Sequence, residues 1–129
     1  MDKINVLIVD DNEEIFLLLR RTLETSGYHV TYAQNGFEAI TMFGIEKPDI
    51  IFLDINMPEM DGIETLRRLT RLEGWGRTVV IILTGYGDIT TARQAMQLGA
   101  YDYITKPIQL NLIESICREA VEEKVMAHA

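Results

Sequence analysis

The stretch INVLIVDD, residues 4–11, decides the fold class. Its first six residues are almost continuously apolar and rich in β-branched side chains, and two adjacent aspartates, Asp10 and Asp11, follow at once. A strand that is apolar on both faces is typical of a parallel sheet covered by helices on both sides. Similar runs recur at 49–54 and 78–84. We therefore expect a buried parallel sheet, with acidic side chains where its first strand ends.

Amphipathic segments alternate with these strands along the chain. Alternation of strand and helix predicts an α/β protein with an open, doubly wound sheet. Gly44 is expected to end the second helix and Asp88 to cap the fourth. The expected strands are 4–9, 28–33, 49–54, 78–84 and 101–105, and the expected helices are 13–27, 35–44, 62–72, 88–99 and 110–125.

Composition excludes several function classes. The chain has 129 residues, which is enough for one domain with a buried core. A net charge of −8 argues against binding to nucleic acid or to an anionic membrane. Cys117 is the only cysteine, so no intrachain disulfide can form and a reducing compartment fits. We see no signal peptide and no transmembrane run, and expect a cytoplasmic protein.

Polar side chains lie at the ends of four of the five expected strands, at the sheet edge where open parallel sheets carry their sites. Neighbouring carboxylates cannot all stay ionised unless a proton or a cation neutralises them. Lys106 supplies one positive charge, and an all-oxygen site prefers a hard cation such as Mg²⁺. A carboxylate nucleophile, Asp54, beside Mg²⁺, an ammonium and a hydroxyl predicts phosphoryl transfer. The strand-end residues are Asp10, Asp11, Asp54, Thr84, Lys106 and Pro107, whereas the second strand ends without such a side chain.

Each of these residues alone also has an ordinary structural explanation. Asp11 or Asn12 can cap the first helix, which does not exclude metal binding. Asp54 and Thr84 can be turn residues, and Lys106 can be a solvated lysine before a helix. Their joint position on one sheet edge favours a site.

Four stretches cover the ends of the expected strands: VDDNEE at 9–14, FLDINMPEMDG at 52–62, ILTGYGD at 82–88 and YDYITKP at 101–107. In this order and spacing they resemble the receiver domain of bacterial two-component response regulators. The resemblance extends over about 4–125 and implies a flavodoxin-like sheet of five parallel strands, order 2-1-3-4-5, with five helices. It also implies one receiver domain, residues 1–129 with its core at about 4–125, and no effector domain in this chain.

The resemblance implies a role for most strand-end residues. Asp54 is expected to accept a phosphoryl group from a sensor histidine kinase or a phosphotransfer protein. Mg²⁺, for which Mn²⁺ can substitute, is expected on the carboxylates of Asp11 and Asp54. Asp10 would act mainly through a bound water, and Asn56 through its backbone carbonyl. Lys106 is expected to pair with a phosphoryl oxygen.

The resemblance further implies a conformational switch. Thr84 is expected to bond a phosphoryl oxygen, and Tyr103 to turn inward into the space that Thr84 vacates. The change would reach the surface of the fourth helix, fifth strand and fifth helix. Gly62 and Pro107 are expected to be structural, with a cis bond before Pro107 that aims the lysine into the site.

Two positions are expected to tune the lifetime of the acyl phosphate, Asn56 and Tyr86. A large Tyr86 over the pocket mouth would hinder the attacking water, so we expect self-hydrolysis not to be at the fast end.

These expectations describe a signalling module rather than an enzyme. Its partners would be a kinase and an output domain or effector protein, with a phosphorylation-dependent dimer as one option. The stretch 84–107 looks more like receivers of enhancer-binding transcriptional activators, so the chain is either a stand-alone receiver or the N-terminal piece of such a regulator. Ile108 departs from the Phe of a major DNA-binding subfamily, whose dimer mode is therefore not assumed.

Two other classes fit less well. Phosphatases of the haloacid-dehalogenase kind carry an Asp-x-Asp nucleophile after the first strand, where this chain has adjacent aspartates. A flavin-binding flavodoxin-like module binds a phosphate at its first loop, and DDNEE would repel that phosphate.

Overall fold

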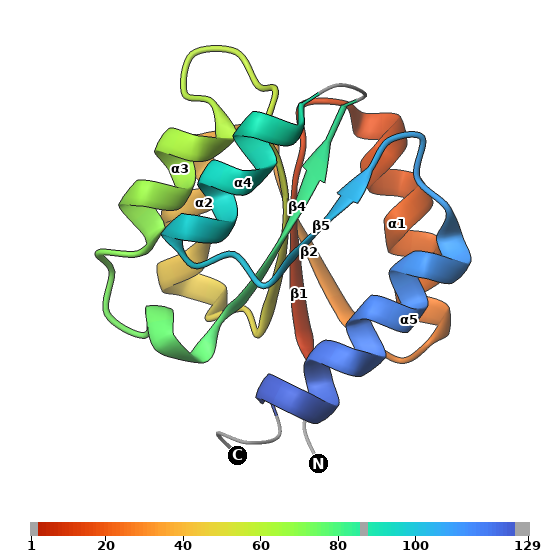
Figure 1. Ribbon diagram of the computed structural model, residues 1–129. Helices are drawn as coiled ribbons and strands as arrows, with labels where there is room; N and C mark the ends of the chain where they lie inside the picture. The colour runs from red at the N-terminus through yellow and green to blue at the C-terminus, as the bar shows by residue number, and fades with distance from the viewer. Residues whose placement is uncertain (1–2, 86–87, 126–129) are drawn as a thin grey trace.

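The computed structural model describes residues 3–85 and 88–125 and confirms the expected architecture (Figure 1). Five parallel strands form one sheet in the order β2-β1-β3-β4-β5. The strands are β1 (Asn5–Val9), β2 (His29–Ala33), β3 (Ile50–Asp54), β4 (Val79–Thr84) and β5 (Asp102–Thr105). The helices are α1 (Glu13–Thr25), α2 (Gly36–Glu46), α3 (Gly62–Leu69), α4 (Ile89–Leu98) and α5 (Leu110–Ala120), with a 3₁₀ turn η1 (Trp75–Arg77) and a π-helical turn η2 (Val121–Val125).

Helices cover both faces of the sheet. Figure 1 shows α1 and α5 on one face and α2, α3 and α4 on the other. Each face has its own apolar cluster, and the central strands β3 and β4 are buried at every residue because both clusters contact them. This burial explains why their sequences are apolar without alternation. Cys117 is buried in the cluster between the sheet, α1 and α5.

The expected end of the second helix is wrong. Gly44 lies inside α2, which continues to Glu46, and the C-cap Lys47 takes a left-handed conformation with φ 47°. Pro48 follows, and a proline disfavours helical conformation in the residue before it. The third helix is also shorter than expected and ends at Leu69.

Parallel pairing brings the carboxyl ends of the strands to one edge, at the top of Figure 1. The register pairs Val9 with Leu53, Asp54 with Leu83, and Thr84 with Thr105. The residues at the carboxyl ends of β1, β3, β4 and β5 therefore meet around one pocket. In the described parts of the chain, all helices are too short or too polar to cross a bilayer.

Candidate functional site

The loop after β1 contributes two carboxylates in different environments. Asp10 is fully buried, and its Oδ1 accepts a hydrogen bond from the backbone N–H of Asn12 at 2.9 Å. Asp11 is exposed. Asn12 caps α1 by accepting from the N–H of Glu14 at 2.9 Å, which decides between the two capping candidates. Capping therefore occupies Asn12 and not Asp11.

The end of β3 holds Asp54 in a nearly closed position. The residue is only 3% exposed, and its Oδ1 accepts from the backbone N–H of Asn56 at 3.1 Å. Gly62, the first residue of α3, donates its N–H to the carbonyl of Ile55 at 2.8 Å. A Cβ at Gly62 would lie 2.6 Å from Ile55 Cα and even closer to the carbonyl oxygen of Asp54. Glycine lets α3 begin directly against the backbone that carries Asp54.

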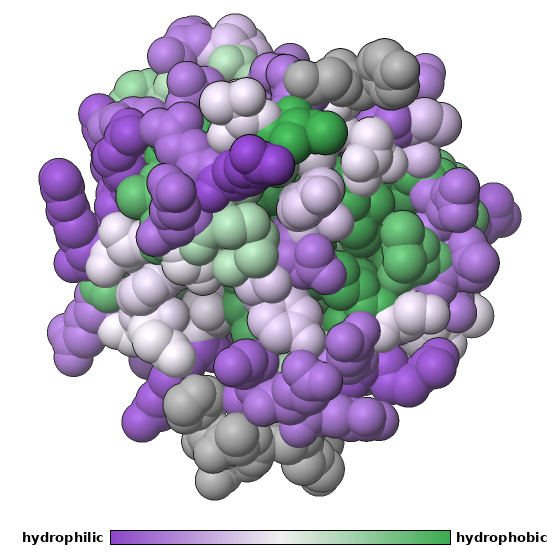
Figure 2. Space-filling model, viewed as in Figure 1, coloured by the Kyte–Doolittle hydropathy of each residue, from purple (hydrophilic) through white to green (hydrophobic). Residues whose placement is uncertain are grey.

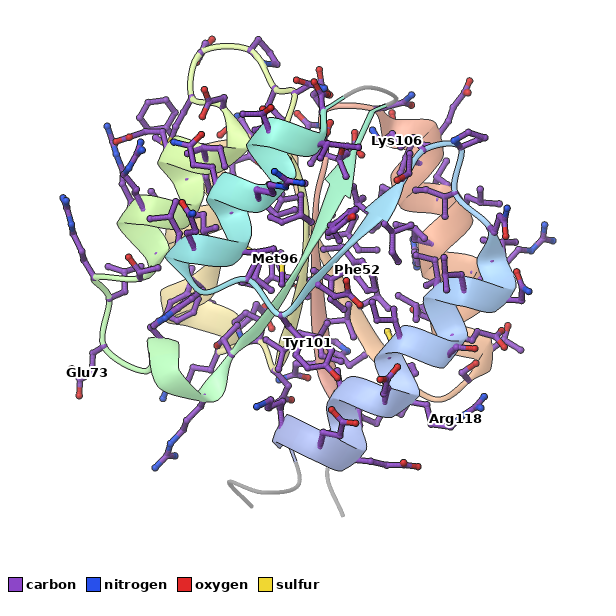
Figure 3. The ribbon with its side chains drawn as sticks, viewed as in Figure 1. Phe52, Glu73, Met96, Tyr101, Lys106 and Arg118 are labelled. Atoms are coloured by element: carbon purple, nitrogen blue, oxygen red, sulfur yellow. The ribbon has the colours of Figure 1, made fainter. Side chains whose placement is uncertain are left out.

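Lys106 joins the two buried carboxylates. Its Nζ lies 3.2 Å from Asp10 Oδ2 and 3.4 Å from Asp54 Oδ2. Its backbone N–H donates to the carbonyl of Thr84 at 2.7 Å, which ties the end of β5 to β4. The bond between Lys106 and Pro107 is cis, as the resemblance implied. Figure 3 shows Lys106 at the upper edge of the sheet.

Negative charge exceeds positive charge in this pocket. Carboxylate oxygens of Asp10, Asp11 and Asp54 lie within 4.8 Å of one another, and they are the group among the described residues that could hold a metal ion. Burial, and then the charge of Asp10, raise the pKa of Asp54 to about 6, although Lys106 opposes this shift. Three oxygen donors with excess negative charge fit a hard divalent cation.

Thr84 and Tyr103 line one cavity of about 360 Å³ between α4 and β5. Thr84 is 3% exposed, and its hydroxyl donates to the carbonyl of Gly85 at 3.0 Å. Tyr103 is 42% exposed. The inward turn expected of Tyr103 concerns the phosphorylated protein and stays a prediction. Tyr86, the other expected lifetime-tuning residue, lies outside the described residues.

Comparison with known proteins assigns the family. A family model described as the response regulator receiver domain matches residues 6–118. The chain belongs to the response regulator receiver domain family. The fold and the signalling class expected from the sequence are thereby confirmed. Receiver domains bind Mg²⁺ at an acidic pocket, and Asp10, Asp11 and Asp54 form an acidic pocket in this receiver domain.

Relatives of this receiver domain include proteins of very different length. It is 36% identical over 118 residues to sporulation initiation phosphotransferase F of Bacillus subtilis (strain 168), a match that covers 92% of this chain and 90% of that protein. It is 37% identical over 121 residues to the regulatory protein AtoC of Escherichia coli (strain K12), covering 94% of this chain and 26% of AtoC. The chain thus spans about a quarter of the length of AtoC.

Solved structures agree with this placement. A response regulator receiver domain protein from Clostridium thermocellum superposes with a TM-score of 0.87 at 28% identity, covering 96% of this chain and 98% of that one. The receiver domain of NtrX from Brucella abortus gives a TM-score of 0.85 at 28% identity, covering 92% and 98%.

Two residues that the sequence analysis did not assign to the site form hydrogen bonds with the site residues Asp10 and Asn56. The hydroxyl of Tyr32, near the end of β2, donates to the backbone carbonyl of Asp10 at 2.8 Å. Asp88, expected as a helix cap, makes no capping hydrogen bond through its side chain to the described residues and instead accepts from Asn56 Nδ2 at 2.9 Å. Strand order would have been a signal for Tyr32, because β2 lies beside β1.

Proposed function

We propose that this receiver domain is a phosphorylation-activated signalling switch in which Asp54 accepts the phosphoryl group. The observation that carries the proposal is the position of Asp54, buried at the end of β3, paired with Lys106 and close to two further carboxylates. The donor would be the phosphohistidine of a sensor kinase or of a phosphotransfer protein. An Asp54 oxygen forms the new P–O bond while the P–N bond breaks, and the departing imidazole keeps the electron pair.

The surrounding residues would neutralise the transferred group. Asp11 and Asp54 would hold Mg²⁺ or Mn²⁺ through their carboxylates, Asp10 through water, and Asn56 through its backbone carbonyl. The bound cation supplies positive charge at the phosphoryl oxygens. The ammonium of Lys106, now shared by two carboxylates, would donate to a phosphoryl oxygen. The protein thus catalyses its own phosphorylation without turning over a metabolic substrate.

The output would pass through the α4-β5-α5 face. The hydroxyl of Thr84 would leave the carbonyl of Gly85 for the phosphoryl group, and Tyr103 would fill the cavity beside it. Apolar side chains are exposed on this face, and Figure 2 shows apolar and polar residues side by side on it. The large apolar side chains that its two helices expose are Ile89 and Met96 on α4 and Leu112 on α5.

The relatives support two protein contexts for this receiver domain, either alone or as part of a longer protein. The match to sporulation initiation phosphotransferase F covers most of that protein, and the match to AtoC covers about a quarter. We propose residues 1–129, with a core at about 4–125, as one cytoplasmic receiver domain. It acts on a partner protein, with a phosphorylation-dependent dimer as one option, or it is the receiver part of a longer transcriptional regulator. It binds neither nucleic acid nor membrane itself.

The test is the intact mass after incubation with a small-molecule phosphodonor and Mg²⁺. The parent should gain one phosphoryl group, and both Asp54→Asn and parent with EDTA should gain none. Glu73→Gln, which removes a carboxylate pointing into solvent far from the pocket (Figure 3), should behave like the parent. Phosphorylation of Asp54→Asn to the same extent would overturn the assignment of the acceptor.

A further inference from the structure

The end of β2 reaches the acidic loop through Tyr32. Its hydroxyl donates to the backbone carbonyl of Asp10 at 2.8 Å. Its ring stacks on Phe16 of α1, with centroids 4.0 Å apart and planes inclined by 11°. The guanidinium of Arg20 lies 6.0 Å from the centroid of the Phe16 ring. The hydroxyl is therefore held by a ring that is itself packed against α1, and has little freedom to leave Asp10.

Strand β2 holds the backbone of Asp10 on both sides. The N–H of Asp10 donates to the carbonyl of Ala33 at 3.2 Å, and the carbonyl of Asp10 accepts from Tyr32. That carbonyl belongs to the peptide group that joins Asp10 to Asp11. Tyr32 thus fixes the orientation of the peptide plane that precedes Asp11. This matters because Asp11 is exposed, so that backbone direction, rather than side-chain packing, decides where its carboxylate points.

The orientation of the Asp10 carboxylate depends less on Tyr32. The N–H of Asn12 binds its Oδ1 and Lys106 binds its Oδ2. These contacts fix the buried carboxylate independently of the Asp10 carbonyl. Loss of the Tyr32 hydroxyl should therefore change mainly the orientation of the Asp11 carboxylate.

We infer that Tyr32 is a positioning residue of the cation pocket. Its hydroxyl holds the peptide between Asp10 and Asp11, and through it the Asp11 carboxylate, in the orientation that binds Mg²⁺. Carboxylates that repel one another bind a cation more tightly when the backbone holds them together before it arrives. This inference rests on the proposed function of the pocket and adds to it a residue from a strand that carries no acidic ligand.

The test compares Tyr32→Phe with the parent in two measurements of Mg²⁺ binding. Phenylalanine keeps the ring and its stack on Phe16 and removes only the hydroxyl. Calorimetric titration of the unphosphorylated protein should show Kd for Mg²⁺ raised about three- to ten-fold, since one hydrogen bond that orients a ligand is lost. The Mg²⁺ concentration for half-maximal phosphorylation should rise by the same factor, whereas the rate at saturating Mg²⁺ should change much less. A general packing defect would instead lower that saturating rate together with the melting temperature of the metal-free protein.

The matched control is Tyr101→Phe. The hydroxyl of Tyr101 also donates one hydrogen bond, to Glu123 Oε2 at 2.9 Å, but the residue lies at the opposite end of the sheet from Lys106 (Figure 3). Its affinity for Mg²⁺ should match that of the parent. A second variant, Phe16→Leu, keeps the hydroxyl while removing the stack, and should weaken binding less than Tyr32→Phe.

The outcomes separate this inference from the proposed function. If the parent binds Mg²⁺ and Tyr32→Phe binds it equally well, the role of Tyr32 is overturned and the pocket stands. Equal weakening in Tyr101→Phe would also overturn it, because the effect would then be general. If the parent itself does not bind Mg²⁺, the cation pocket of the proposed function fails, and the role of Tyr32 fails with it.

Discussion

The side-chain amide of Asn56 donates a hydrogen bond to Asp88 Oδ2 at 2.9 Å, and this contact joins the loop after β3 to the start of α4. Asp88 is also close to the end of β4, since a Cβ at Gly85 would lie 3.3 Å from the same oxygen. A further carboxylate therefore stands beside a pocket that already holds three.

Removing the charge of Asp88 should speed phosphorylation by an anionic phosphodonor. Asp88→Asn keeps an oxygen that can accept from Asn56 but removes one negative charge near the entering anion. At a separation of ~10 Å in water, one charge contributes about 0.4 kcal/mol, so the rate at low ionic strength should rise roughly two-fold. The gain should fade above about 0.1 M salt, where the screening length is ~10 Å.

The measurement is the initial rate of phosphoryl gain against salt concentration, with Glu73→Gln as a control of equal net charge. A gain that does not depend on salt would contradict the electrostatic explanation.

Neutralising Asp54 should stabilise the metal-free protein. Folding raises the pKa of Asp54 from 3.8 to about 6, so the folded state binds its proton more tightly than the unfolded state. The ionised carboxylate therefore costs stability, little near pH 4, increasingly between pH 4 and 6, and fully above pH 6. Asp54→Asn removes this cost and leaves Lys106 paired with Asp10. We expect a gain of about 1–3 kcal/mol at pH 7 in EDTA.

Denaturant unfolding of both proteins at pH 4 and pH 7 checks this expectation. The gain should shrink at pH 4, where the parent is itself protonated at Asp54. Saturating Mg²⁺ should reduce or reverse the gain at pH 7, because the parent then binds the cation with its full set of carboxylates. An equal gain at both pH values would show that charge is not its cause.

A methyl group at Gly62 should displace the backbone that carries Asp54. The substitution Gly62→Ala meets Ile55 and the backbone of Asp54, which cannot move without shifting β3, and should cost about 1–3 kcal/mol. Gly44→Ala is the matched control inside α2, where no described atom outside the adjacent residues and the helix's own backbone lies within 4 Å of the added carbon. It should stabilise the protein by about 0.5–1 kcal/mol through helix propensity. Thermal unfolding of the two variants should therefore move in opposite directions, and a shared direction would refute the steric argument.

Trp75 should report movement of α4. It is the only tryptophan of the chain, and a Cβ at Gly99, the C-cap of α4, would lie 3.6 Å from its ring. If phosphorylation shifts α4, the emission of Trp75 should change with the same time course as phosphoryl gain, and Asp54→Asn should show no change. Constant emission at full phosphorylation would mean that the C-terminal end of α4 stays in place.

The fold and most of the site could be predicted because their signals are local. The buried central strands are apolar at every position except the last. An aspartate at a strand end, such as Asp10 or Asp54, can be recognised in the sequence without knowing its neighbours in space. The contacts of Tyr32 and Asp88 could not be predicted in this way, because each joins segments that are remote in the chain. Gly44 misled the prediction of a helix end, since buried packing of Phe43 and the following Pro48 decide where α2 stops.

Lys106 also has a mechanical role that follows from the strand order. Strand β5 is an edge strand that pairs with β4 alone, yet the ammonium of Lys106 contacts carboxylates at the ends of β3 and β1. The side chain therefore links the edge strand to the ends of two interior strands through ion pairs. A ligand that competes for this ammonium removes these ion pairs, and β5 is then held by its pairing with β4 and by the packing of Ile104 in the core.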